Sequence, residues 1–297
     1  MKIEKVGVVG CGLMGHGIVQ VAATGGCQVI ALETQQVALD KGIARIEKSL
    51  AKLASKNVEK GRMNEDQAQA WVAEVRGRIT PSLDKQHLSD CDLVVEAIVE
   101  NLDVKKGLFS ELGGICDAKT VFASNTSSFP IQEMAEASGR PERFVGLHFF
   151  NPVQLMRLVE VVRTDNTDDE VFAAARAFGE ACGKAPVACK DTPGFVVNRL
   201  LVPYMVQAIQ MLDRGDASKE DIDTAMQFGC GYPMGPLTLT DYVGLDTTLS
   251  ILEGWVERYP NEPAFGIPDS LRTKVAAGKL GRKTGEGYYK WDGDKKA

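Results

Sequence analysis

The residues best suited to proton transfer are a histidine and a glutamate in the middle of the chain. Of three histidines, His148 is the one that ends a short apolar run, Phe144–His148, and Glu160 is the sole acid within the run Leu158–Val162. A carboxylate buried in a strand requires a partner. A histidine is a suitable base for a hydroxyl proton near neutral pH. The residues therefore predict a catalytic pair in which Glu160 orients His148, with a structural histidine as the alternative.

A second polar group, Asn125-Thr126-Ser127-Ser128, follows the apolar run Val121–Ser124. In a doubly wound sheet, substrates meet cofactors at the carboxyl ends of such strands. A hydroxyl in this segment can therefore donate to a substrate oxygen, or it can cap a helix or turn. No nucleophile elbow surrounds these serines, so serine hydrolysis is not predicted.

A glycine-rich segment near the N-terminus, Gly10–Gly15, has the G-x-G-x-x-G pattern of a dinucleotide-binding turn. It follows the apolar run Val6–Val9 and opens a helix, which is the context that gives the pattern meaning. The glycine turn allows close approach of the backbone, and the free N–H groups at the start of the helix favour the binding of a pyrophosphate. Glu33 ends the next apolar run, where a carboxylate binds ribose hydroxyls and repels a 2′-phosphate, so NAD is favoured over NADP. The predicted contacts of this loop are Gly10, Gly12, Leu13, Met14 and Gly15.

The elements that must position these residues alternate along the first 190 residues. Short β-branched runs are separated by helix-length segments, a pattern typical of βαβ units and a mostly parallel sheet. The long polar stretch Gln35–Arg76 interrupts this rhythm and predicts a projecting helical pair. The predicted strands are Val6–Val9, Gln28–Leu32, Asp92–Ala97, Val121–Ser124, Phe144–His148 and Leu158–Val162.

From Thr192 onward the strand-like runs nearly vanish. The predicted helices are Gly194–Leu212 with Pro193 at its start, Asp221–Phe228 begun at Ser218, one within Leu237–Tyr259, and Leu271–Ala277. We therefore predict an α/β fold with a Rossmann-type, doubly wound sheet over residues 1–190. An all-α domain is predicted over residues 191–297.

Composition excludes some classes of protein and indicates the compartment in which this one is expected. The chain has 297 residues, 44% of them hydrophobic, and a net charge of −6, which suits a folded protein without a basic nucleic-acid footprint. Seven scattered cysteines form no C-x-x-C pair, so no metal site is predicted, and free thiols in a reducing compartment are expected. No apolar run is long enough to span a membrane, and no signal peptide precedes the first strand. A cytoplasmic location is therefore expected.

Taken together, the motifs resemble those of the L-3-hydroxyacyl-CoA dehydrogenase family, of the 3-hydroxybutyryl-CoA dehydrogenase type. The resemblance covers essentially the full length, and its central and late motifs are more specific than the glycine loop. It rests on the segments 7–15, 92–101, 123–128, 148–152, 191–199, 235–236 and 281–289.

The resemblance implies roles for residues at matching positions of this sequence. His148 is then the base and Glu160 its partner, and the second domain dimerises and closes over the substrate. The implied catalytic residues are His148, Glu160, Ser127 and Asn198. Positions near the nicotinamide are Glu100 and Lys105. The implied substrate contacts are Ser49, Lys56, Ser127, Asn151 and Asn198.

A lysine-rich helix face bears independently on the substrate. Lys48, Lys52, Lys56 and Lys60 are spaced by four and therefore share one face of a helix. Such a face suits the anionic part of coenzyme A, and a merely solvated surface is the alternative.

These features predict a reversible hydride transfer between an (S)-3-hydroxyacyl-CoA and NAD, with His148 as general base and acid. A dehydrogenase of a free hydroxy acid or sugar acid on the same fold is one alternative, although it has no use for the lysine face. A non-catalytic NAD-binding sensor is the other, although binding alone does not require the set around His148.

Overall fold

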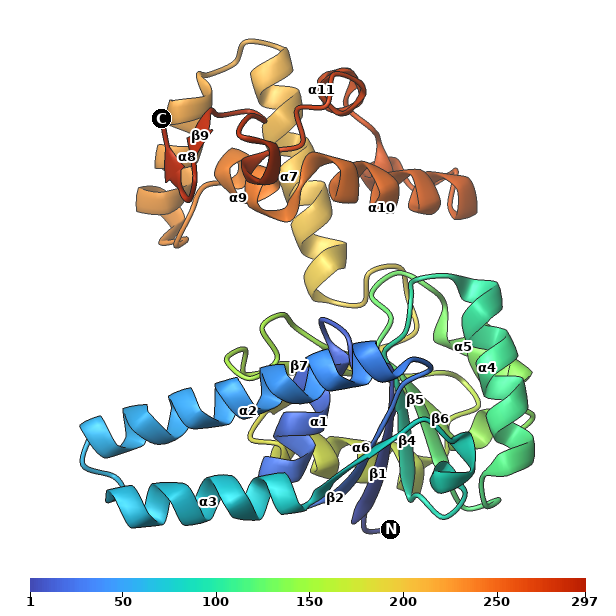
Figure 1. Ribbon diagram of the computed structural model, residues 1–297. Coiled ribbons are helices and arrows are strands. Elements are labelled where there is room, and N and C mark those ends of the chain that lie inside the picture. Colours follow the sequence, from blue (N-terminus) through green and yellow to red (C-terminus); the bar gives the residue numbers. More distant parts are fainter. The chain divides into compact units, whose positions relative to one another are not determined.

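The structure is a computed structural model that describes all 297 residues. It comprises two units, Met1–Phe195 and Val196–Ala297, and each has its own buried core (Figure 1). The division lies a few residues beyond the boundary expected after Lys190. No helix in either unit combines the length and the apolar character needed to cross a bilayer.

The first unit is built on one eight-stranded sheet with the strand order β3-β2-β1-β4-β5-β6-β7-β8. All neighbouring strands run parallel except β6 and β7, which are antiparallel. This arrangement confirms the predicted Rossmann-type, mostly parallel sheet. The strands are β1 (Lys5–Val9), β2 (Gln28–Leu32), β3 (Ile79–Ser82), β4 (Leu93–Glu96), β5 (Val121–Ser124), β6 (Phe144–Phe149), β7 (Leu158–Arg163) and β8 (Ala185–Lys190).

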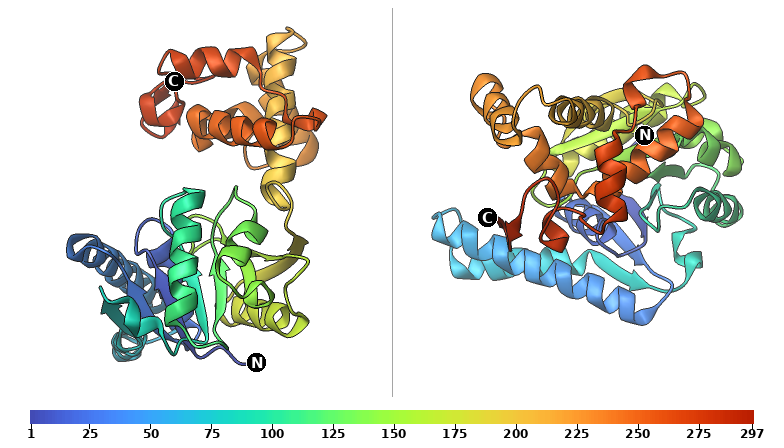
Figure 2. Two further views of the ribbon diagram at one scale, coloured as in Figure 1. Left: turned by 90° about the vertical axis from the view of Figure 1, so that its right-hand side faces the viewer. Right: turned by 90° about the horizontal axis from the view of Figure 1, so that it is seen from above.

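Helices cover both faces of this sheet (Figure 1; Figure 2). One buried cluster joins the sheet to α1, α2, α3 and α6, and a second joins it to α4 and α5. The central strands are therefore buried on both faces, which explains their nearly continuous apolar sequences. The helices are α1 (Gly15–Thr24), α2 (Gln36–Glu59), α3 (Glu65–Gly77), α4 (Leu102–Ile115), α5 (Ile131–Ala137) and α6 (Asp169–Ala181), with short 3-10 turns at Lys85–Leu88 and Pro141–Arg143.

The predicted helical pair is α2 and α3, which extends away from the sheet in Figure 1. The buried residues of α2 recur at helical spacing, from Leu39 through Ile46 and Leu50 to Ala54, and leave the other faces polar. Asn64 begins α3 by accepting a hydrogen bond from the backbone N–H of Gln67, whose side chain in turn accepts a bond from the backbone N–H of Asn64.

The second unit is helical and ends in a small hairpin. Its core includes the side chains of Ile209, Leu237, Leu252 and Trp255. Its elements are α7 (Val197–Asp213), α8 (Lys219–Cys230), α9 (Pro236–Val243), α10 (Leu245–Arg258), α11 (Asp269–Ala276), β9 (Trp291–Asp292) and β10 (Lys295–Lys296), with 3-10 turns at Pro263–Phe265 and Arg282–Thr284. The all-α prediction is confirmed apart from this hairpin.

One predicted helix start in this part of the chain is wrong, and one stretch predicted to contain a single helix contains two. Pro193 does not open α7, because Gly194 and Phe195 adopt left-handed backbone conformations (φ of 73° and 53°) that interrupt a helix. The stretch Leu237–Tyr259 forms two helices because Gly244 has a φ of 100°. The predicted start of α8 is confirmed, since Ser218 accepts from the backbone N–H of Asp221.

Candidate active site

The candidate site residues of the first unit gather at the carboxyl edge of its sheet. Strands β1, β2, β4, β5 and β6 all run parallel, so the segments that follow them emerge at the same edge. These segments include the glycine loop, Glu33, Glu100 and Ser127, while His148 is the penultimate residue of β6. The topology thus brings together residues from five separate parts of the sequence.

The glycine loop has the geometry that a pyrophosphate requires. Gly10 has a φ of 94°, and a Cβ there would lie 2.6 Å from the carbonyl oxygen of Ala97. A Cβ on Gly15 would lie 1.7 Å from the carbonyl oxygen of Gly10, so only glycine allows this close packing. Nothing lies within 4 Å of a Cβ built on Gly12, which leaves its backbone open to a ligand. The helix α1 begins at Gly15 without a side-chain cap, so its N-terminal dipole faces the loop.

Glu33 lies directly after β2 and is tied to this loop. Its carboxylate accepts hydrogen bonds from the backbone N–H of Cys11 (2.8 Å) and of Thr34 (3.1 Å). A half-buried carboxylate held beside the glycine turn suits the ribose hydroxyls of NAD. Burial raises the pKa of the Cys11 thiol to about 11, so this cysteine is not a thiolate nucleophile near neutral pH.

His148 and Glu160 lie opposite each other on two adjacent strands. They are register partners in the antiparallel pair β6 and β7, and His148 Nδ1 lies 2.7 Å from Glu160 Oε2. The His148 side chain is 8% exposed and that of Glu160 is 0% exposed. An ionised carboxylate can only accept, so Nδ1 donates and Nε2 is left to exchange a proton with a substrate.

Two aromatic rings pack against the imidazole of His148. The ring centroid of His148 lies 4.4 Å from that of Phe150 and 5.6 Å from that of Phe195. Phe195 is buried with a φ of 53°, a left-handed conformation that is rare for a bulky side chain. Together with Glu160, these rings restrict how the imidazole can turn.

The Asn-Thr-Ser-Ser segment lies next to this pair. Asn125 Oδ1 accepts a hydrogen bond from the backbone N–H of Phe149 (2.9 Å), which fixes the end of the strand that carries His148. Ser127 is half-buried, and its Oγ lies 3.2 Å from Ser128 Oγ. Neither serine caps α5, because that helix begins after Pro130. The hydroxyl of Ser127 therefore lies at the carboxyl edge of the sheet without serving as a helix cap, and its predicted contact with the substrate stays a prediction.

Asn151 and Asn198 lie in different units. Asn151 is exposed and follows β6 closely, three residues after His148. Asn198 lies in the first turn of α7 in the second unit. Its predicted hydrogen bond to the reacting oxygen or to the region of the histidine stays a prediction.

Glu100 and Lys105, the two residues predicted to lie near the nicotinamide, differ in the exposure of their side chains. Lys105 is 1% exposed and its Nζ forms ion pairs with Glu96 (2.6 Å) and Glu100 (3.0 Å). The Glu100 side chain is 42% exposed at the carboxyl edge. Glu100 therefore presents the larger surface to a ligand, and the predicted cofactor contacts of both residues stay predictions.

The predicted coenzyme A face lies along α2. Ser49 is half-buried, whereas Lys48, Lys52 and Lys56 are exposed along this helix and Lys60 is exposed at its C-cap. None of these four lysines forms an ion pair. Their charges are therefore available to an anionic ligand.

Sequence reasoning missed Glu96 and the ring of Phe195. Glu96 is the last residue of an apolar strand, as isolated an acid as Glu160, so the rule that a buried charge needs a partner would have found it. No pattern in the sequence indicates that Phe195 contacts His148.

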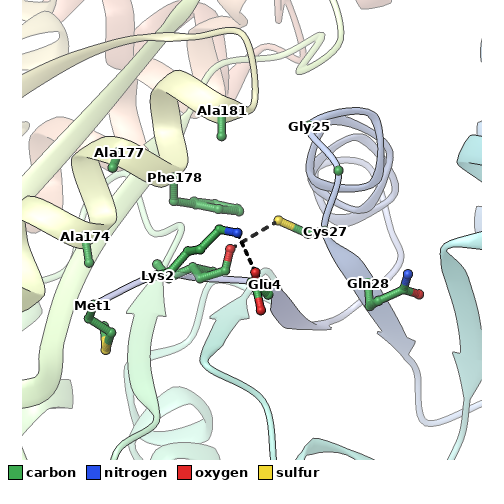
Figure 3. A pocket seen from close by; sticks show the side chains of 12 residues that line it. Met1, Lys2, Glu4, Gly25, Cys27, Gln28, Ala174, Ala177, Phe178 and Ala181 are labelled. Carbon is green, nitrogen blue, oxygen red and sulfur yellow. Dashed lines mark hydrogen bonds and ion pairs between the residues drawn. The ribbon is translucent and has the colours of Figure 1, made fainter.

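A separate pocket of about 850 Å³ lies at the opposite, amino edge of the sheet (Figure 3). It is lined by the segments before β1 and β2 and by the apolar side of α6, including Phe178. Its charged side chains Lys2 and Glu4 pair with each other, and the Cys27 thiol donates to the carbonyl oxygen of Ile3. It contains none of the predicted site residues.

Comparison with known families assigns the chain to a class. Residues 5–192 match the NAD binding domain of 3-hydroxyacyl-CoA dehydrogenase, and residues 194–291 match the C-terminal domain of that enzyme. The chain therefore belongs to the 3-hydroxyacyl-CoA dehydrogenase family. This confirms the predicted class of enzyme, an NAD-dependent oxidoreductase, and its cofactor.

Relatives over the whole length agree with this assignment. A mitochondrial hydroxyacyl-coenzyme A dehydrogenase of Rattus norvegicus is 50% identical over 97% of this chain and 91% of its own. A probable 3-hydroxybutyryl-CoA dehydrogenase of Deinococcus radiodurans is 48% identical over 97% of this chain and 100% of its own. The crystal structure of (S)-3-hydroxybutyryl-CoA dehydrogenase from Ralstonia eutropha has a TM-score of 0.91 and 40% identity, covering 98% of this chain and 100% of that one.

Proposed function

We propose that the chain interconverts (S)-3-hydroxyacyl-CoA, with 3-hydroxybutyryl-CoA as the favoured substrate, and the corresponding 3-ketoacyl-CoA. The observation that carries this proposal is the buried pair of His148 and Glu160, with 2.7 Å between Nδ1 and Oε2, at the edge that holds the glycine loop. The family assignment and the names of the full-length relatives support the same reaction.

Each residue of the proposed site has its own role in the reaction. NAD, when bound, supplies the hydride acceptor or donor. His148 Nε2 takes the proton of the substrate hydroxyl during oxidation and returns it to the ketone oxygen during reduction. Glu160 fixes the tautomer of His148 and stabilises the imidazolium. Ser127 and Asn198 donate hydrogen bonds to the reacting oxygen, and Asn151 supports the same pocket.

Coenzyme A is proposed to bind along α2, with Ser49 and Lys56 as contacts. The unpaired lysines of this helix support the proposal, because the nucleotide part of coenzyme A carries phosphate charges. A dehydrogenase of free hydroxy acids would have no use for this face. Glu33 and the glycine loop are proposed to hold NAD, together with Glu100 and Lys105.

The second unit is proposed to form a homodimer. Phe228 is 86% exposed in α8, and Tyr232 lies exposed a few residues later. Large exposed apolar side chains of this kind mark association surfaces. Sedimentation should give twice the 32.1 kDa mass of the chain, and Phe228→Glu should shift it toward monomer. A monomeric wild-type protein would contradict this proposal.

We also propose a cytoplasmic location. All seven cysteines are free thiols and five of them are buried, which suits a reducing compartment. Fractionation of the source cells tests this, and recovery in an organelle or outside the cell would overturn it.

The central test is the initial rate of NADH consumption with acetoacetyl-CoA, measured beside free acetoacetate and beside NADPH. A fast rate with the thioester and NADH only is expected from the proposals for α2 and Glu33. A fast rate with free acetoacetate would favour a hydroxy-acid dehydrogenase instead. NADH binding without turnover of either compound would favour a sensor.

A further inference from the structure

The last residue of the first unit, Phe195, combines a rare backbone conformation with a contact to the candidate base. Its φ is 53°, in the left-handed region that bulky side chains seldom adopt. It is 5% exposed, and its ring centroid lies 5.6 Å from that of His148. A strained conformation of this kind persists only where the surrounding structure holds it, and such residues cluster at functional sites. The backbone of Phe195 therefore points to a role beyond packing.

The linker that carries Phe195 is fixed to the first unit by its first residue. Asp191 follows β8, and its backbone N–H donates to the carbonyl oxygen of Arg163 (3.1 Å), which extends the pairing of β7 and β8. Its carboxylate accepts a hydrogen bond from the backbone N–H of Gln132 (2.9 Å) in the first turn of α5. Because Pro130, the N-cap residue of α5, provides no side-chain cap, Asp191 supplies one from a distant part of the chain. The linker is thus attached to β7 and to α5 before it reaches Phe195.

A tight turn then brings the ring of Phe195 to the imidazole. The backbone N–H of Phe195 donates to the carbonyl oxygen of Thr192 (2.9 Å), and Gly194 within this turn has a φ of 73°. The side chain of Phe195 belongs to the buried cluster on the α4 and α5 side of the sheet. The hydrogen bond from Nδ1 to Glu160 fixes one point of the His148 ring, and the ring of Phe195, tilted by 56° to it, packs against another.

We propose that Phe195 is a positioning residue that holds the imidazole of His148 in the orientation set by Glu160, and that the left-handed turn of the linker places it there. The inference rests on the proposed function, because His148 is the proposed base. Phe195 acts through His148, so its effect falls on the chemical step. A base that is already held in one orientation does not have to be ordered again in each turnover.

Three linker variants and one control test this role. Phe195→Ala removes the ring, whereas Phe195→Leu keeps an apolar side chain that still reaches the imidazole. Gly194→Ala leaves the ring in place and adds a Cβ at a left-handed residue, which disturbs the turn, and it carries the test if Phe195→Ala does not fold. Phe178→Ala is the matched control, because Phe178 is also a buried phenylalanine of the first unit but lines the separate pocket at the amino edge.

The first readout is the NMR spectrum of protein whose histidine rings carry ¹³C and ¹⁵N, and it needs no substrate. The chain has three histidines, and the signal of His148 is the one that disappears in His148→Ala. We expect one narrow His148 signal in wild type and Phe195→Leu, and a broadened or split signal in Phe195→Ala and Gly194→Ala. The other two histidine signals should stay unchanged. Phe178→Ala should keep the wild-type signal of His148 although its melting temperature falls.

The second readout is kcat for reduction of acetoacetyl-CoA at saturating NADH. We expect a loss of about tenfold in Phe195→Ala and Gly194→Ala with KM changed by no more than about twofold, because the orientation of the base affects the chemical step. Phe195→Leu should stay within about threefold of wild type, since it keeps most of the packing. Phe178→Ala should match wild type. In a His148→Ala background, Phe195→Ala should lower kcat by no more than about twofold, because the group being positioned is gone.

Three results would overturn the inference. One is a His148 signal in Phe195→Ala that is as narrow as in wild type. Another is an equal fall of kcat in Phe195→Ala and Phe178→Ala, which would mean that both act through stability alone. The third is a raised KM with an unchanged kcat, which would mean that Phe195 contacts the substrate. If the wild-type protein does not reduce acetoacetyl-CoA, the proposed function fails, and the NMR comparison still decides whether Phe195 holds the imidazole.

Discussion

Replacement of Glu160 by glutamine removes one charge from the centre of the site and keeps the size of the side chain. The bond from His148 Nδ1 to Glu160 Oε2 is 2.7 Å long and buried, so it is of the charge-assisted kind. Such a bond contributes roughly 1.5–3 kcal/mol, against about 0.5–1.5 kcal/mol for a neutral one. A loss of about 1.4 kcal/mol in the transition state lowers kcat about tenfold.

Tenfold is a lower bound for this variant. The amide of glutamine can donate to Nδ1, which would leave the proton on Nε2 and remove the base. The assay is kcat for acetoacetyl-CoA reduction and for the reverse oxidation, with the melting temperature measured in parallel. Glu180→Gln, an exposed substitution on α6, is the control. Because the two residues act as one unit, adding Glu160→Gln to His148→Ala should cost nothing further. Wild-type kcat in Glu160→Gln, or a fully additive double variant, would refute the reasoning.

Further predictions concern the cofactor, the coenzyme A face, the second unit and the thiols. Glu33→Ser should reduce the preference for NADH over NADPH, measured as the ratio of kcat/KM values, and an unchanged ratio would exclude Glu33 from the ribose site. Lys52→Glu with Lys56→Glu should raise KM for acetoacetyl-CoA about tenfold at low salt, but not for the N-acetylcysteamine thioester, which lacks the nucleotide. Asp241→Ala should destabilise the protein by about 3 kcal/mol or more by calorimetry, because this buried carboxylate accepts three hydrogen bonds from the C-terminal segment. Native protein should react with iodoacetamide at Cys230 at most, because burial raises the pKa of the other six thiols; fast labelling of more than one site would contradict this.

The central strands were predictable because burial on both faces leaves an apolar run that is easily recognised. β2 and β5 have the bounds that the sequence predicts, and β1, β4, β6 and β7 differ only at their ends. The missed strands, β3 and β8, lie at the two edges of the sheet and contain Pro81 and Pro186. An edge strand needs fewer backbone hydrogen bonds and tolerates proline, so its sequence lacks the usual signal.

The candidate site was predictable where a charged residue lies within an apolar segment of the sequence. Glu160 is a charge inside an apolar strand, so it required a partner, and His148 proved to be its register partner. Glu96 obeys the same rule, but its partner Lys105 lies in a polar helical stretch that gives no such signal. The contact of Phe195 with His148 depends on a left-handed turn in the linker, which is a property of the tertiary structure.

The most direct test of the account compares wild type and His148→Ala in the oxidation of (S)-3-hydroxybutyryl-CoA, followed as NADH formation. We expect rapid turnover by wild type and a kcat at least ~10²-fold lower in the variant, with unchanged melting temperature and NADH binding. Turnover of the thioester by His148→Ala at the wild-type rate would contradict the central claim that His148 carries the proton.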